Sequence, residues 1–123
     1  MVRLPLAVHV ARATEMSADL TRKRDIERYL NHLGRMKPET FIAMLERVSQ
    51  HSSRAALPEL DTPALVIGAE LDHFTPPRLS VELSHLLPDA ELKILSGATH
   101  AAPIEDTVQI NKLIRQFLQR CVE

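Results

Sequence analysis

The 123-residue sequence has no tryptophan, a single cysteine and three glycines, and its aromatic side chains are three phenylalanines and one tyrosine. The lone Cys121 cannot form an internal disulfide, so a reducing, cytoplasmic compartment and a fold held by its apolar core are expected. The few aromatic side chains offer few platforms on which unpaired bases could stack. This composition excludes a disulfide-stabilised secreted domain and argues against single-stranded nucleic-acid binding.

An excess of charge of one sign is also lacking, because fifteen Lys and Arg oppose sixteen Asp and Glu, for a formal net charge of -1. No basic run or face is present to meet nucleic-acid phosphates, so no nucleic-acid partner is expected. No apolar run approaches the roughly 18 to 20 residues that a membrane-spanning helix needs, so no membrane partner is expected either.

The start of the chain imitates a secretory signal. Arg3 precedes an apolar stretch from Leu4 to Val10, and Ala11-Arg12-Ala13 has the spacing of a cleavage site. Pro5 and His9 interrupt a stretch that is already short. We therefore expect no cleavage here and expect the first residues to belong to a packed segment.

Before Leu60 the periodic signals are helical. Apolar residues recur at helical spacing between Thr21 and Leu33, and Gly34 follows where a left-handed C-terminal cap is expected. A second helix is expected from Pro38, a residue that suits the first helical position. Its wide apolar stripe consists of Phe41, Ile42, Met44, Leu45 and Val48. Residues 1–60 are thus predicted to form a helical segment.

After Leu60 the pattern alternates between strand and helix. The continuous apolar run Ala64 to Ile67 predicts a strand buried on both faces, and the alternation of Glu91 to Leu95 predicts a half-covered strand. Between them, Thr75 is expected to cap a helix. The final helix is marked by Ile110, Leu113, Ile114, Phe117 and Leu118. Residues 61–123 are therefore predicted to form a βαβα unit with parallel strands.

Titratable side chains follow both predicted strands. Asp72 and His100 are 28 positions apart in the sequence, but neighbouring parallel strands lie about 4.8 Å apart and end at the same edge of a sheet. A carboxylate that accepts the Nδ1 proton of an imidazole prepares Nε2 to act as a base. Spacing alone leaves open the alternative that these are a surface Asp and a loop His that never touch.

The same rim holds candidate residues for two other chemistries, a nucleophile and a metal site. Ser96 and Thr99 lie close to His100 in sequence, but neither begins a helix or has a visible pair of backbone donors, so neither is expected to be a nucleophile. A metal site could be drawn from Glu70, Asp72, His73 and His100. Because no H-E-x-x-H spacing and no cysteine partner is present, no metal and no cofactor are expected.

Between Pro63 and Phe117 the sequence resembles the C-terminal end of the α/β-hydrolase fold superfamily, through P-A-L-V-I-G-A-E-L-D-H-F-T-P-P, L-P-D-A-E-L-K-I-L, S-G-A-T-H-A-A-P-I-E and I-N-K-L-I-R-Q-F-L. The resemblance implies an α/β fold, the C-terminal βαβα part of a parallel α/β-hydrolase sheet preceded by cap-like helices. The family's D-x-x-[TV]-P-P arrangement implies Asp72 as the catalytic acid, and its [GS]-x-x-H loop implies His100 as the catalytic histidine.

The sequence departs from the family at the nucleophile. Members carry a serine in G-x-S-x-G, but Gly34, Gly68 and Gly97 are too far apart to flank any serine in this way. The resemblance therefore implies a Ser-His-Asp hydrolase of esters or similar acyl bonds, with a small-molecule acyl substrate, of which this chain supplies only the acid and the base. A non-catalytic interaction module derived from a truncated hydrolase is the alternative.

The resemblance also implies an interaction surface. In the family the seventh strand lies between the sixth and the eighth, and this sequence has no counterpart of the sixth. The run Ala64 to Ile67 is therefore expected to expose unpaired backbone groups along one edge. We expect the chain to self-associate, or to pair with a complementing chain, through this edge.

Overall fold

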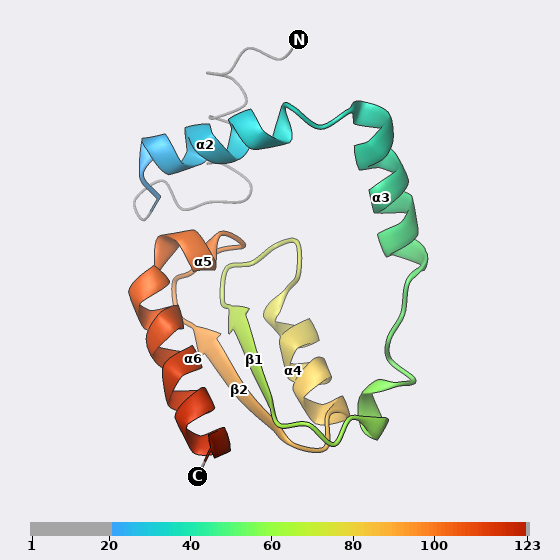
Figure 1. Cartoon of the computed structure of the whole chain (residues 1–123), viewed down its shortest axis with the longest axis vertical. Coiled ribbons are helices and arrows are strands. Elements are labelled where there is room, and N and C mark those ends of the chain that lie inside the picture. The colour runs from blue at the N-terminus through green and yellow to red at the C-terminus, as the bar shows by residue number, and fades with distance from the viewer. Residues whose placement is uncertain (1–20, 123) are drawn as a thin grey trace.

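The computed structural model describes residues 21–122, so the signal-like start of the chain lies outside the described residues. Figure 1 shows the order of the elements. They are helix α2 (Lys23–Leu33), helix α3 (Pro38–Gln50), the 3-10 turn η1 (Leu57–Glu59), strand β1 (Ala64–Ala69), helix α4 (Pro77–Leu86), strand β2 (Ala90–Leu95), helix α5 (Ala102–Glu105) and helix α6 (Thr107–Val122).

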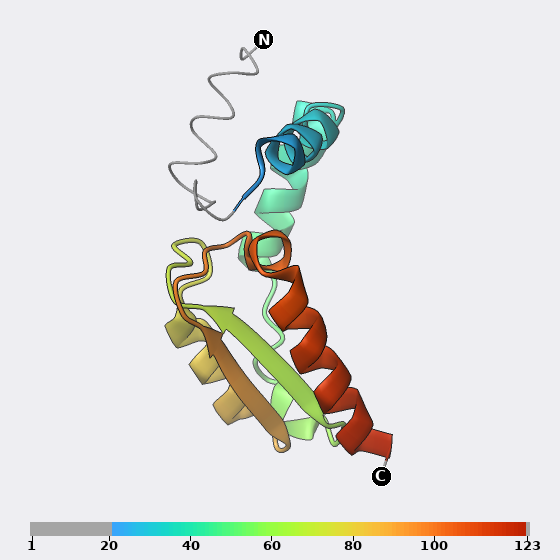
Figure 2. The same cartoon turned by 90° about the vertical axis from the view of Figure 1, so that its left-hand side faces the viewer.

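Strands β1 and β2 form a parallel pair that runs from Ala64 opposite Ala90 to Ala69 opposite Leu95. Figure 2 shows this pair between α4 on one face and α6 on the other. The predicted parallel strand-helix-strand-helix arrangement is therefore confirmed. At Gly68 an added Cβ would lie 2.6 Å from Oγ of Ser80, so glycine at this position allows α4 to pack closely on β1.

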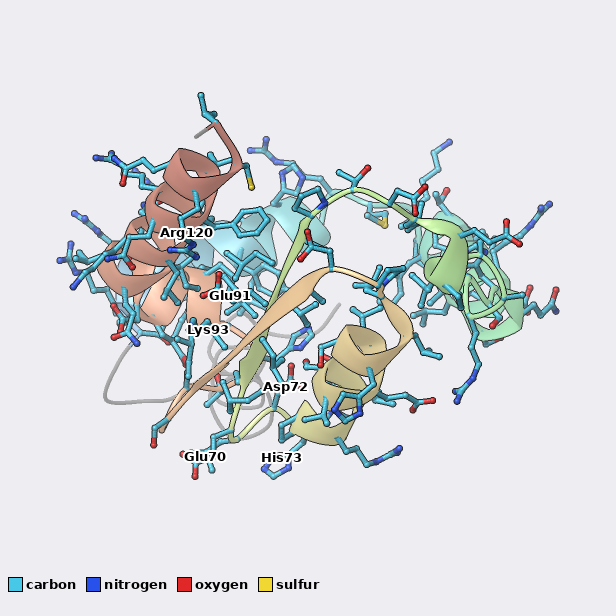
Figure 3. The ribbon with its side chains drawn as sticks, turned by 90° about the horizontal axis from the view of Figure 1, so that it is seen from below. Glu70, Asp72, His73, Glu91, Lys93 and Arg120 are labelled. Atoms are coloured by element: carbon cyan, nitrogen blue, oxygen red, sulfur yellow. The ribbon has the colours of Figure 1, made fainter. Side chains whose placement is uncertain are left out.

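The opposite face of the sheet packs against α6. Glu91 forms ion pairs with Lys93, at 3.0 Å, and with Arg120 near the end of α6, and Figure 3 shows the three side chains together. The small core lies at the carboxyl ends of the strands, which is where the loops carrying Asp72 and His100 begin. Its buried members are Ala69, Leu95, Ala98 and Ala102, with Ile67, Ile110 and Leu113 packed against them.

Strand β1 differs from the prediction of a strand buried on both faces. Val66 is buried, but Leu65 and Ile67 are only half-buried, because β2 is the only strand paired with β1 in the two-stranded sheet of the described residues. The N–H groups of Ala64 and Glu70 donate to the carbonyls of Asp89 and Leu95 on the β2 side.

Backbone groups alternate in direction along a strand, so the N–H groups of Leu65, Ile67 and Ala69 point to the outer edge of β1. No strand among residues 21–122 covers that edge.

Helices α2 and α3 precede the sheet, as predicted. Gly34 does not adopt the expected left-handed cap: it has φ -67° and ψ -11°, because its N–H continues the helical turn by donating to the carbonyl of Leu30 at 2.8 Å. Ile26 of α2 is fully buried against Ala101, so α2 rests on the start of α5. No residue of α3 is buried, and its apolar stripe is exposed. The assignment of these helices to a cap stays a prediction.

Within residues 21–122, every helix is too short or too polar to cross a membrane.

Candidate active site

Asp72 lies in the loop that follows β1, and its buried carboxylate is held by four hydrogen bonds. Oδ1 accepts the N–H groups of Phe74 at 2.8 Å and Thr75 at 2.9 Å. Oδ2 accepts the hydroxyl of Thr75 at 2.7 Å and lies 3.0 Å from Nδ1 of His100. An Asp side chain that bonds the backbone two and three residues later closes a turn of the Asx type, so the loop fixes the direction of the carboxylate.

These hydrogen bonds lower the pKa of Asp72. Burial by itself would raise the pKa of this carboxyl, but the hydrogen bonds from the hydroxyl and N–H of Thr75, from His100 and from the N–H of Phe74 outweigh it. Together they lower the pKa of Asp72 from 3.8 to about 2. The carboxylate is therefore ionised at neutral pH and suited to hold a proton on Nδ1 of His100.

His100 follows β2, and the sheet brings it to Asp72 as the strand ends predict. Its side chain is 45% exposed, whereas that of Asp72 is 9% exposed, so the imidazole is accessible and its carboxylate partner is not. The ring of Phe74 lies against it, with centroids 5.2 Å apart and planes tilted by 39°. The contact between Asp72 and His100 is present, while their catalytic role stays a prediction.

A cavity of about 280 Å³ adjoins the Asp72 and His100 pair. Its walls include β1 from Ile67 to Ala69, together with Ser80 and Pro103. The cavity thus connects the acid and base pair with apolar surface of β1, the strand whose outer edge no described strand covers.

The two hydroxyls near His100 serve neighbouring carboxylates. Ser96 donates to Oε2 of Glu70 at 2.7 Å, and Thr99 donates to Oε1 of Glu105 at 2.8 Å. A hydroxyl has one proton, so neither side chain offers it to His100 in this arrangement. Hydrogen bonds from Ser96 and from the N–H of Gly97 also hold the pKa of Glu70 below its usual value.

The four candidate metal ligands, Glu70, Asp72, His73 and His100, do not come together around one point. Figure 3 shows Asp72 directed inward between β1 and α4, whereas His73 points outward at the rim. Glu70 faces Ser96 and Gly97 instead. Among residues 21–122, no group of three or more His, Cys, Asp or Glu side chains is close enough to hold a metal ion.

The prediction that Thr75 caps α4 is wrong. The N-cap position of α4 is Pro76, and no side chain caps the helix. The hydroxyl of Thr75 donates to Asp72 instead. The D-x-x-T spacing is the signal that could have identified this contact, because an Asp commonly accepts hydrogen bonds from residues two and three positions later.

The lowered pKa of Asp72 predicts a specific loss of stability in acid. A carboxyl whose folded pKa lies below its unfolded value stabilises the fold above the unfolded value, near 3.8, and this contribution disappears as the pH falls toward 2. The difference amounts to about 2 kcal/mol. Urea unfolding at about pH 7, 4, 3 and 2 should therefore show a gap between the wild type and Asp72→Asn that narrows only below pH 4. Asp61→Asn, which makes the same change at an exposed carboxylate before β1, is the control, and a gap independent of pH contradicts the assignment.

Comparisons with known proteins show similarity to hydrolases in sequence and to α/β-hydrolases in fold. A Pseudomonas 2-hydroxy-6-oxononadienedioate/2-hydroxy-6-oxononatrienedioate hydrolase is 32% identical over 88 residues, which are 68% of this chain and 31% of that protein. An α/β-hydrolase from the sediment metagenome of the Mar Chica lagoon is 27% identical with a TM-score of 0.65, over 80% of this chain and 45% of that one. A bromoperoxidase from Bacillus anthracis shares the fold with a TM-score of 0.84 at 16% identity, over 96% of this chain and 44% of that one.

The chain therefore spans less than half the length of each of these proteins. The sequence pattern of the family described as the alpha/beta hydrolase fold matches residues 22–107, a range that contains both Asp72 and His100. The chain belongs to the alpha/beta hydrolase fold family.

Proposed function

We propose that this chain supplies the acid and the base of a Ser-His-Asp triad that hydrolyses an ester or a similar acyl bond, with Asp72 as the acid and His100 as the base. The observation that supports this most directly is the 3.0 Å contact between Oδ2 of Asp72 and Nδ1 of His100, made by a buried carboxylate with a lowered pKa and an accessible imidazole. Family membership supports hydrolysis as the reaction class.

The reaction follows from this pairing. With Asp72 ionised, the neutral imidazole of His100 carries its proton on Nδ1, and Nε2 has a free electron pair. Nε2 takes the proton of a serine hydroxyl while the serine oxygen attacks the carbonyl carbon, and the imidazolium then passes this proton to the leaving group as the acyl bond breaks. Asp72 stabilises the positive charge on His100 between these two steps. Water repeats the sequence to release the acid and restore the serine.

We assign the serine to a G-x-S-x-G segment outside this chain, since none of its serines stands in such a motif. The outer edge of β1 is the proposed junction: within residues 21–122 no strand accepts the N–H groups there, and the cavity lined by Ile67 to Ala69 is also lined by His100. The proposed partner is therefore a polypeptide that adds a strand at this edge and brings the nucleophile. A small-molecule acyl compound is the proposed substrate, and the lone Cys121 favours a cytoplasmic setting.

Complementation tests this proposal. The chain is produced with the part of the Pseudomonas hydrolase that it does not match, as a fusion and as two separate chains, and hydrolysis of p-nitrophenyl esters and of 2-hydroxy-6-oxononadienedioate is measured. We expect no turnover by either part alone, because this chain lacks the serine and the other part lacks the histidine, and losing either costs on the order of 10⁶ in rate. Turnover is expected once both parts are present. A complex that assembles but hydrolyses none of these substrates contradicts the proposal.

The exposed apolar stripe of α3, with Ile42 56% and Val48 69% exposed, favours a second candidate, a non-catalytic module that binds a partner. The substitution His100→Ala distinguishes the binding module from the hydrolase part. If the chain is such a module, His100→Ala leaves its partner binding and any cellular phenotype unchanged. If it is part of a hydrolase, the same substitution abolishes turnover in the complemented protein.

A further inference from the structure

Each of the four residues 96–99, which lead from β2 to His100, makes at least one hydrogen bond to another loop or helix. Between the end of β2 and His100, Ser96 and Gly97 donate to Oε2 of Glu70 at 2.7 and 2.8 Å. The carbonyl of Ala98 accepts the N–H of Leu71 at 2.9 Å. Thr99 donates its N–H and its hydroxyl to Glu105 at 2.9 and 2.8 Å. Two carboxylates thus receive most of the hydrogen bonds that define the path of this segment.

Glu70 links the loop of the acid to the loop of the base. It stands two residues before Asp72, and its two hydrogen bonds reach the turn after β2, where Gly97 adopts a φ of +70° that only glycine takes without strain. Hydrogen bonds to an ionised carboxylate are stronger than those between neutral groups. Together with the backbone bonds from Glu70 to Leu95 and from Leu71 to Ala98, the carboxylate of Glu70 joins the two loops whose side chains meet at 3.0 Å.

Glu105 holds the same segment from the other side. It is half-buried at the end of α5, and its Oε1 also accepts the hydroxyl of the buried Thr21 at 3.3 Å. Thr99, which it binds through two groups, immediately precedes His100. Displacing this peptide would change where the imidazole lies relative to Asp72.

From these contacts we propose that Glu70 and Glu105 are positioning residues for His100. They touch neither the reacting bond nor the imidazole in the contacts described above, and they act by holding residues 96–99 so that Nδ1 stays against Asp72. The inference rests on the proposed role of His100, but its first test does not require hydrolysis.

The test measures which nitrogen of the neutral His100 ring carries the proton, by ¹⁵N NMR of the full chain. The signals of His100 are assigned by their loss in His100→Ala. The wild type should hold the proton mainly on Nδ1, because Asp72 accepts it. In the Glu70→Ala/Glu105→Ala double variant the fraction protonated on Nδ1 should fall at least twofold. Glu91→Ala is the matched control, because it removes a carboxylate that pairs with Lys93 and Arg120 elsewhere on the sheet.

A folded double variant with an unchanged proton position overturns the inference, and so does an equal change in Glu91→Ala. If the double variant does not fold, the single variants Glu70→Gln and Glu105→Gln test the inference instead. Glutamine keeps one acceptor oxygen, so the fraction of His100 protonated on Nδ1 should be intermediate in each. Wild-type fractions in both variants overturn the inference. In the complemented protein the alanine variants should lower kcat about 10- to 100-fold while KM stays within twofold. Absence of turnover in the complemented wild type counts against the proposed function alone, because the NMR comparison still decides the positioning role.

Discussion

Replacing His100 with alanine in the complemented hydrolase is expected to lower kcat on the order of 10⁶-fold, because the serine then has no base to take its proton. Asp72→Asn should lower kcat by about 10⁴-fold, since an amide can donate to Nδ1 and so stabilise the wrong tautomer of the imidazole. The two losses should not add in the double variant, because the pair acts as one unit. Initial rates with a p-nitrophenyl ester at saturating concentration provide the measurement.

His73→Ala is the matched control for this prediction. His73 is the neighbour of Asp72 in sequence, but its side chain points outward at the rim. Its replacement should leave kcat within about twofold, as expected for a surface site away from the chemistry. Turnover by His100→Ala close to that of the wild type would remove this residue from the mechanism, and an equal loss in His73→Ala would mean that the loop rather than the pair is being measured.

The second large effect is expected at the outer edge of β1. Ile67→Pro removes an N–H that points away from β2, so it should preserve the pairing of β1 with β2 and disturb only the addition of another strand. The partner strand would lose one hydrogen bond and keep an unpaired carbonyl. That raises the dissociation constant of the two-chain complex about 10- to 100-fold. Titration calorimetry with the separate chains provides the measurement.

Ile67→Ala is the control for the edge prediction, because it removes the same apolar side chain but keeps the N–H. Ile67 packs on the core and lines the cavity, so both variants share the loss of its side chain. Equal affinities of the two variants would show that the side chain, not the strand edge, makes the contact. Binding of Ile67→Pro as tight as the wild type would exclude this edge as the junction.

The parallel strand pair could be predicted from the sequence because it depends on local patterns, whereas spacing alone left open whether Asp72 and His100 touch. Apolar runs define the strands, a helix between them forces parallel pairing, and residues just after the two strands must then share one edge. The resemblance to α/β-hydrolases singled out this pair among the titratable residues there. The two helices before Leu60 could also be predicted, because their apolar residues recur at helical spacing.

What the sequence did not reveal depends on contacts between loops. The hydroxyl of Thr75 had two possible roles, to accept an N–H group at the start of α4 or to donate to Asp72, and the path of the loop around Asp72 decided between them. The four-residue helix α5 is too short to show periodicity. Glu70 and Glu105 bind segments in other loops, so no spacing rule identified them.

The acid and the base belong to a single strand-helix-strand unit, and this determines when in folding they meet. Only 28 positions separate Asp72 from His100, whereas Thr21 and Glu105, which join α2 to α5, are 84 positions apart. Closing a short chain loop costs less entropy than closing a long one, and contacts of low contact order form sooner. We therefore expect the contact between the imidazole and its carboxylate to form before α2 docks on α5.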